Sequence, residues 1–231
     1  MSVFKFKQFD VIQQHSAMKV GTDGVLLGSW VNCEESETIL DIGCGTGLLS
    51  LMLAQRNSKS KIVAIEIDER AANEAKLNFN RSKWKNRLTL YNVSLQNFRS
   101  IEKFDLIISN PPFFPANNSI KVRDIARHMN TLNFEELFFC AEKLLKPSGI
   151  FSLLVPNSSE DFCSKVALAN RFFCNRVCYV RGNKSTAFKR ILMEFSFKKK
   201  KVEKDHLTIE KSRHKYTDQY IGLCKKFYLN L

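Results

Sequence analysis

The stretch "LDIGCGTGLLS", Leu40 to Ser50, decides the fold of this chain of 231 residues. A short apolar run typical of a buried strand leads into three closely spaced glycines, and a helical pattern follows them. Glycine adopts positive φ without strain and lets the backbone approach a ligand closely. Gly43, Gly45 and Gly47 therefore predict a strand, a tight turn and a helix, with a ligand held at the turn.

Short apolar runs alternate with helical patterns through the rest of the chain. This alternation predicts an α/β fold with a mainly parallel sheet, helices on both faces, and ligands at the carboxyl ends of the strands. The last two strands are joined by the short segment "RGNKSTAF" and should pair as a hairpin, which makes the last strand antiparallel. The expected strands are residues 38–43, 61–67, 88–93, 104–109, 149–156, 174–180 and 189–197.

Helices are also expected at both ends of the chain. The segment "VGTDGVLLGSWV" should form a capped helix with Thr22 or Asp23 near its start, and "YTDQYIGLCKKFYLNL" should form a terminal helix. Pro147 and Gly149 should mark the end of the helix that begins at "FEELFF".

The composition is that of a globular protein, with 44% hydrophobic and 26% charged residues. No apolar run approaches the roughly 20 residues that span a bilayer, and the first ten residues lack the apolar core of a signal peptide. A cytoplasmic protein without a membrane anchor is expected. The seven cysteines show no C-x-x-C spacing and the four histidines complete no zinc pattern, so we expect reduced thiols and no metal.

The positive charge is concentrated near the C-terminus. Residues 171–231 contain 16 Lys and Arg against 5 Asp and Glu, a net charge of +11 out of +13 for the whole chain. Such a local field attracts polyanions such as nucleic acid or an anionic membrane. On charge alone, a solvated surface that keeps the protein soluble explains the lysines equally well.

Two carboxylates accompany the glycine turn. Asp41 lies just before the glycines, and Glu66 ends the next strand, where it is placed to hold ribose hydroxyls. The G-x-G-x-G spacing differs from the G-x-G-x-x-G of dinucleotide enzymes, and no second nucleotide-binding half follows. A Walker loop is excluded because the turn lacks a G-K-[ST] ending.

"LDIGCGTGLLS" together with "IEID" resembles motifs I and II of the class I S-adenosylmethionine-dependent methyltransferases. The resemblance implies a Rossmann-like fold with a mixed seven-stranded sheet, an antiparallel last strand, and S-adenosyl-L-methionine as cofactor. It also implies that the three glycines surround the methionine part of the cofactor, that Asp41 helps to hold its ammonium group, and that Glu66 holds the ribose. Ser94 occupies the place of the family's usual acidic adenine contact.

A second motif, "NPPF", follows the strand at 104–109 and resembles the [NDS]-P-P-[YFW] motif of amino-methylating enzymes in this family. The exocyclic amine of adenine is a poor nucleophile, because its lone pair is delocalised into the ring. The Asn110 side-chain oxygen and the Pro111 carbonyl can accept hydrogen bonds from its two N–H groups, and the prolines make that carbonyl rigid. Phe113 can stack on the base.

The N-terminal segment "FKFKQFDVIQQHSAMKVGTDGVLLGSWV" resembles that of the bacterial tRNA (adenine-N6)-methyltransferases that act on adenosine 37 of a valine tRNA. The later stretches "RDIARHMNTLNFEEL" and "RGNKSTAFKRILMEFSF" are also similar to that family. The resemblance implies a tRNA partner, and it makes Lys19, Thr22 and Asp23 candidate cofactor contacts. The candidate RNA contacts are Lys5, Lys7, Pro112, Phe114, Arg123, Arg127, His128 and Arg190.

Three other functions remain open at this level. They are methylation of a protein glutamine (N5), methylation of DNA adenine (N6), and RNA binding by an inactive methyltransferase fold. The expected organisation is a single methyltransferase domain, 1–231, with an N-terminal segment, 1–37, that covers the cofactor and a basic part, 171–231. No obligate protein partner is indicated.

Overall fold

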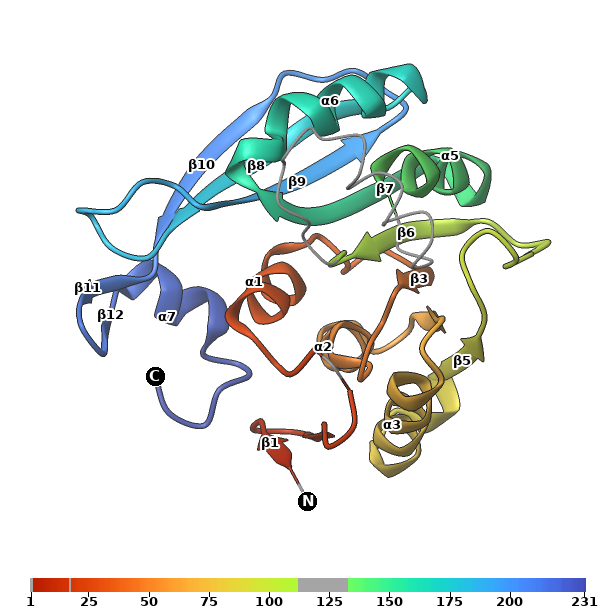
Figure 1. Ribbon diagram of the computed structural model, residues 1–231, viewed down its shortest axis with the longest axis horizontal. Helices are drawn as coiled ribbons and strands as arrows, with labels where there is room; N and C mark the ends of the chain where they lie inside the picture. Colours follow the sequence, from red (N-terminus) through yellow and green to blue (C-terminus); the bar gives the residue numbers. More distant parts are fainter. Residues whose placement is uncertain (1, 17, 112–132) are drawn as a thin grey trace, which may run out of the picture.

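The computed structural model describes residues 2–16, 18–111 and 133–231. Within these residues a mixed eight-stranded sheet crosses the molecule in the order β10-β8-β9-β7-β6-β3-β4-β5 (Figure 1). The strands are β3 (Thr38–Ile42), β4 (Lys61–Glu66), β5 (Leu88–Asn92), β6 (Phe104–Ser109), β7 (Leu145–Pro156), β8 (Phe173–Arg181), β9 (Arg190–Ser196) and β10 (Glu203–Thr208).

All seven expected strands are present, and β9 pairs antiparallel with both β7 and β8, as the short connection predicted. The eighth strand, β10, pairs parallel with β8 at the edge of the sheet and was not predicted. Its sequence, "EKDHLT", has one buried residue, Leu207. An edge strand with so little buried surface leaves no apolar alternation in the sequence, so the count of seven was one short.

Helices cover both faces of the sheet, as expected (Figure 1). One buried cluster joins the sheet to four helices, and a second joins the opposite face to two. The first group is α1 (Thr22–Trp30), α2 (Leu48–Arg56), α3 (Glu69–Arg81) and α7 (Asp218–Cys224). The second is α5 (Phe134–Leu144) and α6 (Glu160–Ala169), and single turns η1 (Lys85–Arg87) and η2 (Asn157–Ser159) connect elements.

The N-terminal hairpin of β1 (Val3–Lys5) and β2 (Asp10–Ile12) lies beside the C-terminal residues. Phe6 forms an isolated bridge with Tyr228, and their ring centroids are 5.8 Å apart. A second hairpin, β11 (Glu210–Ser212) and β12 (Lys215–Tyr216), precedes α7. Figure 1 shows both chain ends on the same side of the molecule.

Three helix ends differ from the sequence expectation, one in its capping and two in their position. α1 begins at Thr22 as expected, but its N-cap is Gly21 and no side chain caps it. α5 ends at Leu144, before Pro147 and Gly149, because β7 begins at the next residue and includes both. The terminal helix stops at Cys224, because the next residues turn back so that Phe227 is buried and Tyr228 reaches Phe6.

In the part of the chain that the structure describes, no helix is both long enough and apolar enough to cross a membrane.

Candidate active site

The glycine turn follows β3 and leads into α2. Gly43, Gly45 and Gly47 have φ values of +67°, +55° and +82°, which L side chains rarely adopt. A Cβ on Gly43 or Gly45 would have no neighbour within 4 Å, whereas a Cβ on Gly47 would lie 2.4 Å from the Phe79 ring of α3. Gly43 and Gly45 thus leave backbone open to a ligand, and Gly47 is needed for packing.

Asp41, in β3, is fully buried below this turn. Its Oδ2 accepts hydrogen bonds from the Ser50 amide and hydroxyl at 3.1 and 2.7 Å. Its Oδ1 is buried and has no hydrogen-bond partner among the described residues. Burial raises the pKa of Asp41 to about 7; the Ser50 hydrogen bonds oppose this rise and the nearby Glu66 adds to it. A buried carboxylate with a free oxygen suits a cationic ligand group such as an ammonium.

Glu66 ends β4 and reaches back to the glycine turn. Its Oε2 accepts a hydrogen bond from the Gly45 amide at 2.8 Å, and its Oε1 accepts one from the Asp68 amide at 2.9 Å. Glu66 therefore holds the turn against the start of α3, a role that the sequence did not reveal. Each carboxylate oxygen has a further lone pair, so contact with a ribose stays a prediction.

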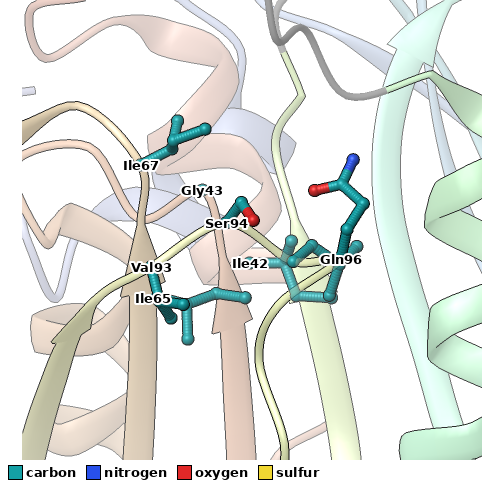
Figure 2. A pocket seen from close by; sticks show the side chains of 8 residues that line it. Ile42, Gly43, Ile65, Ile67, Val93, Ser94 and Gln96 are labelled. Carbon is teal, nitrogen blue, oxygen red and sulfur yellow. The ribbon is translucent and has the colours of Figure 1, made fainter.

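A pocket opens beside the turn at the carboxyl ends of β3, β4 and β5 (Figure 2). Ser94 lines it, and Figure 2 shows the Ser94 side chain between Ile67 and Gln96. Ile67 is 47% exposed, an unusual amount for an isoleucine next to a buried strand. The mostly aliphatic lining fits a flat heterocycle such as adenine. The residues lining the pocket are Ile42, Gly43, Ile65, Ile67, Val93, Ser94, Leu95 and Gln96.

Asn110 follows β6 at the same edge of the sheet. Ile42 of β3 is in register with Ser109 of β6, and the Ser109 hydroxyl donates to the Ile42 carbonyl at 2.9 Å. Gly43 and Asn110, the next residues along the chain, therefore lie side by side where these adjacent strands end. The Asn110 Oδ1 is buried and has no hydrogen-bond partner among the described residues, so it is available as an acceptor.

Pro111 is buried directly after Asn110. The other residues expected near the target base lie outside the described residues. They are Pro112, Phe113, Phe114, Arg123, Arg127 and His128.

The N-terminal segment is tied to α3 by two buried polar side chains that sequence reasoning missed. The Glu74 carboxylate accepts hydrogen bonds from three successive backbone amides, those of residues 14–16, at 2.6, 2.7 and 3.0 Å. Asn78 bonds the Ile12 amide and carbonyl and also donates to the Thr46 carbonyl in the glycine turn. Their four-residue spacing on the buried face of α3 was the available signal.

The remaining candidates on the N-terminal side are at or near the surface. Lys19 and Thr22 are exposed, and Asp23 accepts a hydrogen bond from Arg190 Nε at 2.9 Å. That ion pair joins the start of α1 to the start of β9, so Arg190 has a structural contact besides its predicted RNA contact.

Lys5 and Lys7 lie on the exposed N-terminal hairpin. Lys7 donates to the Lys225 carbonyl at 2.7 Å. Both stay candidate RNA contacts.

All seven cysteines are free, and no cluster of His, Cys, Asp or Glu in the described part of the chain is suited to a metal ion. Burial raises the pKa of Cys174 and of Cys178 to about 12, which keeps both thiols protonated.

These features of the glycine turn, the pocket and Asn110, at the carboxyl ends of the strands of a mixed α/β sheet, fit the class of α/β methyltransferases. Residues 12–177 match the family model described as "Methyltransferase small domain", and the chain belongs to this family. It is 45% identical to the tRNA1(Val) (adenine(37)-N6)-methyltransferase of Flavobacterium psychrophilum, over 99% of this chain and 100% of that one. It is 43% identical to the enzyme of the same name from Christiangramia forsetii, over 99% and 98% of the two chains.

Solved structures support the fold. The crystal structure of a predicted O-methyltransferase from Agrobacterium tumefaciens superposes with a TM-score of 0.72 at 18% identity, over 89% of this chain and 96% of that one. A putative RNA methyltransferase from Pyrococcus horikoshii gives a TM-score of 0.54 at 18% identity, over 77% and 81%.

S-adenosyl-L-methionine is the methyl donor of class I methyltransferases, and the residues at this edge of the sheet fit it. The Asp41 oxygen that no described residue bonds suits its ammonium group. The open positions at Gly43 and Gly45 leave room for its methionine part. The aliphatic pocket at Ser94 suits its adenine.

Proposed function

We propose that this chain is a methyltransferase that modifies the N6 amine of adenosine 37 in tRNA1(Val). The enzymes of that name in other bacteria are 40–45% identical to it along nearly its whole length. The structural observation that carries the proposal is the Asn110 oxygen beside the glycine turn, which is buried and has no hydrogen-bond partner in the described part of the chain. An amide acceptor in that position fits an amine substrate better than a hydroxyl or carbon nucleophile.

The residues around the acceptor perform positioning rather than proton chemistry. S-adenosylmethionine, when bound, supplies a methyl group on a positively charged sulfur. Asn110 Oδ1 accepts a hydrogen bond from one N–H of the adenine amine, and the Pro111 carbonyl accepts the other. Both bonds favour a more tetrahedral nitrogen and aim its lone pair. Holding the amine in line with the methyl group accounts for most of the expected acceleration.

The RNA side of the proposal rests on charge. The C-terminal part, 171–231, carries a net charge of +11 and supplies β8 to β12 and α7, along one end of the sheet. A basic surface beside the site attracts the phosphates of a tRNA and positions it. The chain acts in this proposal as one domain, in the cytoplasm, with the N-terminal segment 1–37 folded over the cofactor.

The deciding experiment is methyl transfer from labelled S-adenosylmethionine to total tRNA, total DNA and release factors in parallel. We expect N6-methyladenosine in tRNA, at position 37 of the valine tRNA. Label found in a protein glutamine or in DNA, and not in tRNA, would refute the proposal and select one of the two enzyme alternatives. No transfer to any of the three would favour an RNA-binding protein without turnover.

A variant of Asn110 tests the mechanism separately. Asn110→Ala should lower kcat at least about 100-fold, as removal of one preorganised hydrogen-bonding group does elsewhere. Its affinity for S-adenosylhomocysteine, measured by calorimetry, should stay within about twofold of the wild type. Asn80→Ala, on the exposed side of α3, is the matched control and should keep full activity. Full turnover by Asn110→Ala would show that the acceptor is not needed.

A further inference from the structure

Three aromatic rings lie together where β10, the outermost strand of the sheet, pairs with β8. The ring centroids of Tyr179 and His206 are 5.5 Å apart with an interplanar angle of 22°, so these rings are stacked. Phe188 lies 5.2 Å from His206 and 5.9 Å from Tyr179. His206 is exposed, and the other two rings are partly exposed. We call these three side chains the ring cluster.

The fold places the ring cluster on a defined face. Tyr179 and His206 are paired residues of parallel strands, so their side chains project to the same face of the sheet. That face carries α6, because the Tyr179 hydroxyl donates to Glu160 of α6 at 2.6 Å. Figure 1 shows β10 at the outer edge, beyond the strands that α6 crosses. The stack therefore runs from the covered part of the sheet outward to an exposed imidazole.

The third ring is held by an ordered loop. Phe188 belongs to the connection between β8 and β9, in which Lys189 N donates to the Val180 carbonyl at 2.9 Å. Within the loop, Asn183 and Thr186 bond each other through backbone and side chain. Because hydrogen bonds hold both the end and the turn of this loop, the ring cluster is already formed in the protein without a bound partner.

Positive charge surrounds the ring cluster. The Arg181 guanidinium lies 5.1 Å from the Phe188 ring centroid and also donates to Thr208. Lys204, two residues before His206 in β10, projects to the same face, and Lys184 and Lys189 are exposed in the loop. Two acids of α6, Glu160 and Asp161, act on Tyr179, and Glu160 already accepts the Tyr179 hydroxyl. Stacked rings with a cationic border fit a nucleic acid strand.

The ring cluster also lies at the same end of the sheet as Asn110, the end at which the parallel strands finish. In the order β6-β7-β9-β8-β10, β8 is three strands from β6 and β10 is four. With neighbouring strands about 4.8 Å apart, the lateral separation is about 14 to 19 Å. That is the length of roughly four to six stacked nucleotides at about 3.4 Å each. One RNA strand can thus reach both places.

We propose that Tyr179, Phe188 and His206 form a stacking platform for an unpaired base of the RNA substrate, a few nucleotides from the adenosine that is methylated. The inference rests on the proposed function, since it names the part of the chain that holds the same substrate. Unpaired bases are recognised by stacking on aromatic side chains, and every base offers a flat face. The exposed face of His206 continues the Tyr179 stack outward and receives the base, while Arg181, Lys184 and Lys204 meet the flanking phosphates.

Variants of the exposed ring test the platform. His206→Ala should raise KM for the valine tRNA transcript about five- to twentyfold, the loss expected for one stacked base. Affinity for S-adenosylhomocysteine and the melting temperature should stay unchanged, since the His206 side chain is exposed. His206→Trp should restore KM to the wild-type value or below it, because a larger ring stacks better, whereas His206→Gln should behave like alanine.

A binding measurement removes any dependence on turnover. Fluorescence anisotropy with the labelled anticodon stem-loop RNA should show weaker binding by the double variant F188A/H206A than by the wild type. Phe139→Ala is the matched control, because Phe139 is a 50% exposed phenylalanine on α5 in contact with Lys143, outside the ring cluster. That variant should bind like the wild type.

The two proposals fail in different ways. If the wild-type protein methylates no tRNA, the proposed function is wrong. If it methylates tRNA normally while His206→Ala and F188A/H206A keep wild-type KM and RNA affinity, the platform is wrong and the proposed function stands. Equal loss in His206→Ala and His206→Trp would also overturn it, because stacking would not be what the position supplies.

Discussion

Glu74 offers the sharpest test of how the N-terminal segment is held. Its carboxylate, 3% exposed, receives three backbone N–H groups from residues 14–16. Glu74→Ala removes all three bonds and leaves the helix intact, since alanine is the best helix former. We expect the segment to detach locally and the rest of the protein to stay folded.

The free-energy cost of Glu74→Ala depends on which of the three backbone N–H groups water can reach. A hydrogen bond to a charged group contributes roughly 1.5–3 kcal/mol. Gln14 and His15 are exposed, so water can replace most of what their amides lose, whereas Ser16 is buried. Glu74→Ala should therefore destabilise the attached state of the N-terminal segment by about 2 kcal/mol, close to the contribution of one hydrogen bond from a buried donor. That free energy corresponds to a factor of about 30 in the equilibrium between attached and detached segment.

Two measurements check this expectation. Amide hydrogen exchange in residues 12–16 should accelerate by up to about 30-fold. If the segment covers the cofactor, affinity for S-adenosylhomocysteine should fall by about tenfold or more. Lys76→Ala, at an exposed position of the same helix, is the control and should change neither quantity. Faster exchange with unchanged affinity would refute the covering role, and unchanged exchange would refute the anchor itself.

Two further predictions concern Asp41 and the glycine turn. Burial raises the folded-state pKa of Asp41 to about 7 from 3.8. Between these two pH values the folded protein therefore binds a proton that the unfolded chain has lost. Stability to urea, without cofactor, should therefore decrease as the pH rises from about 4 to about 7, and Asp41→Asn should flatten this profile; an equal slope in both proteins would contradict it. Both Gly43→Ala and Gly47→Ala strain the backbone, because the two residues have φ values of +67° and +82°, but only Gly47→Ala also forces a Cβ to 2.4 Å from Phe79. Gly47→Ala should therefore lower the melting temperature more than Gly43→Ala, which should also weaken cofactor binding. Equal melting temperatures of the two variants would contradict this division.

The sequence predicted well the parts of the fold that bury apolar surface. The seven strands between residues 38 and 197 were found because their short apolar runs differ from the helical patterns between them. Most of these runs reflect burial, although no residue of β5 is buried. The glycine turn was found because its backbone angles require glycine. β10 was missed because its side chains are almost all exposed, and the end of α5 was misplaced because Pro147 is tolerated in β7 where the pairing with β6 is irregular.

The site shows a different limit of sequence reasoning. Asp41, Glu66 and Asn110 were named from their places at the ends of predicted strands and from motifs that resemble those of a known family, and the structure brings the glycine turn and Asn110 to the same end of the sheet. Glu74 and Asn78 escaped notice because their partners are backbone atoms 32 to 66 residues away. A hydrogen bond to a distant backbone atom leaves no mark on the composition or periodicity of either segment. Polar residues on a buried helix face are the one trace that remains.

The start of α1 is where the three parts of the proposed reaction meet. A Cβ on Gly24 would lie 3.0 Å from Leu48, so it would press on the helix after the glycine turn, and it would be in ordinary van der Waals contact, at 3.9 Å, with the side-chain nitrogen of Asn110, the proposed acceptor. The preceding residue, Asp23, binds Arg190 at the start of β9, within the basic part 171–231 that also contains the ring cluster. Both partners of this pair are about a third exposed, so its contribution to stability is small, about 1 kcal/mol or less. Its importance is positional, because the same short segment lies between the N-terminal segment, the proposed acceptor Asn110 and the strands proposed to face the RNA.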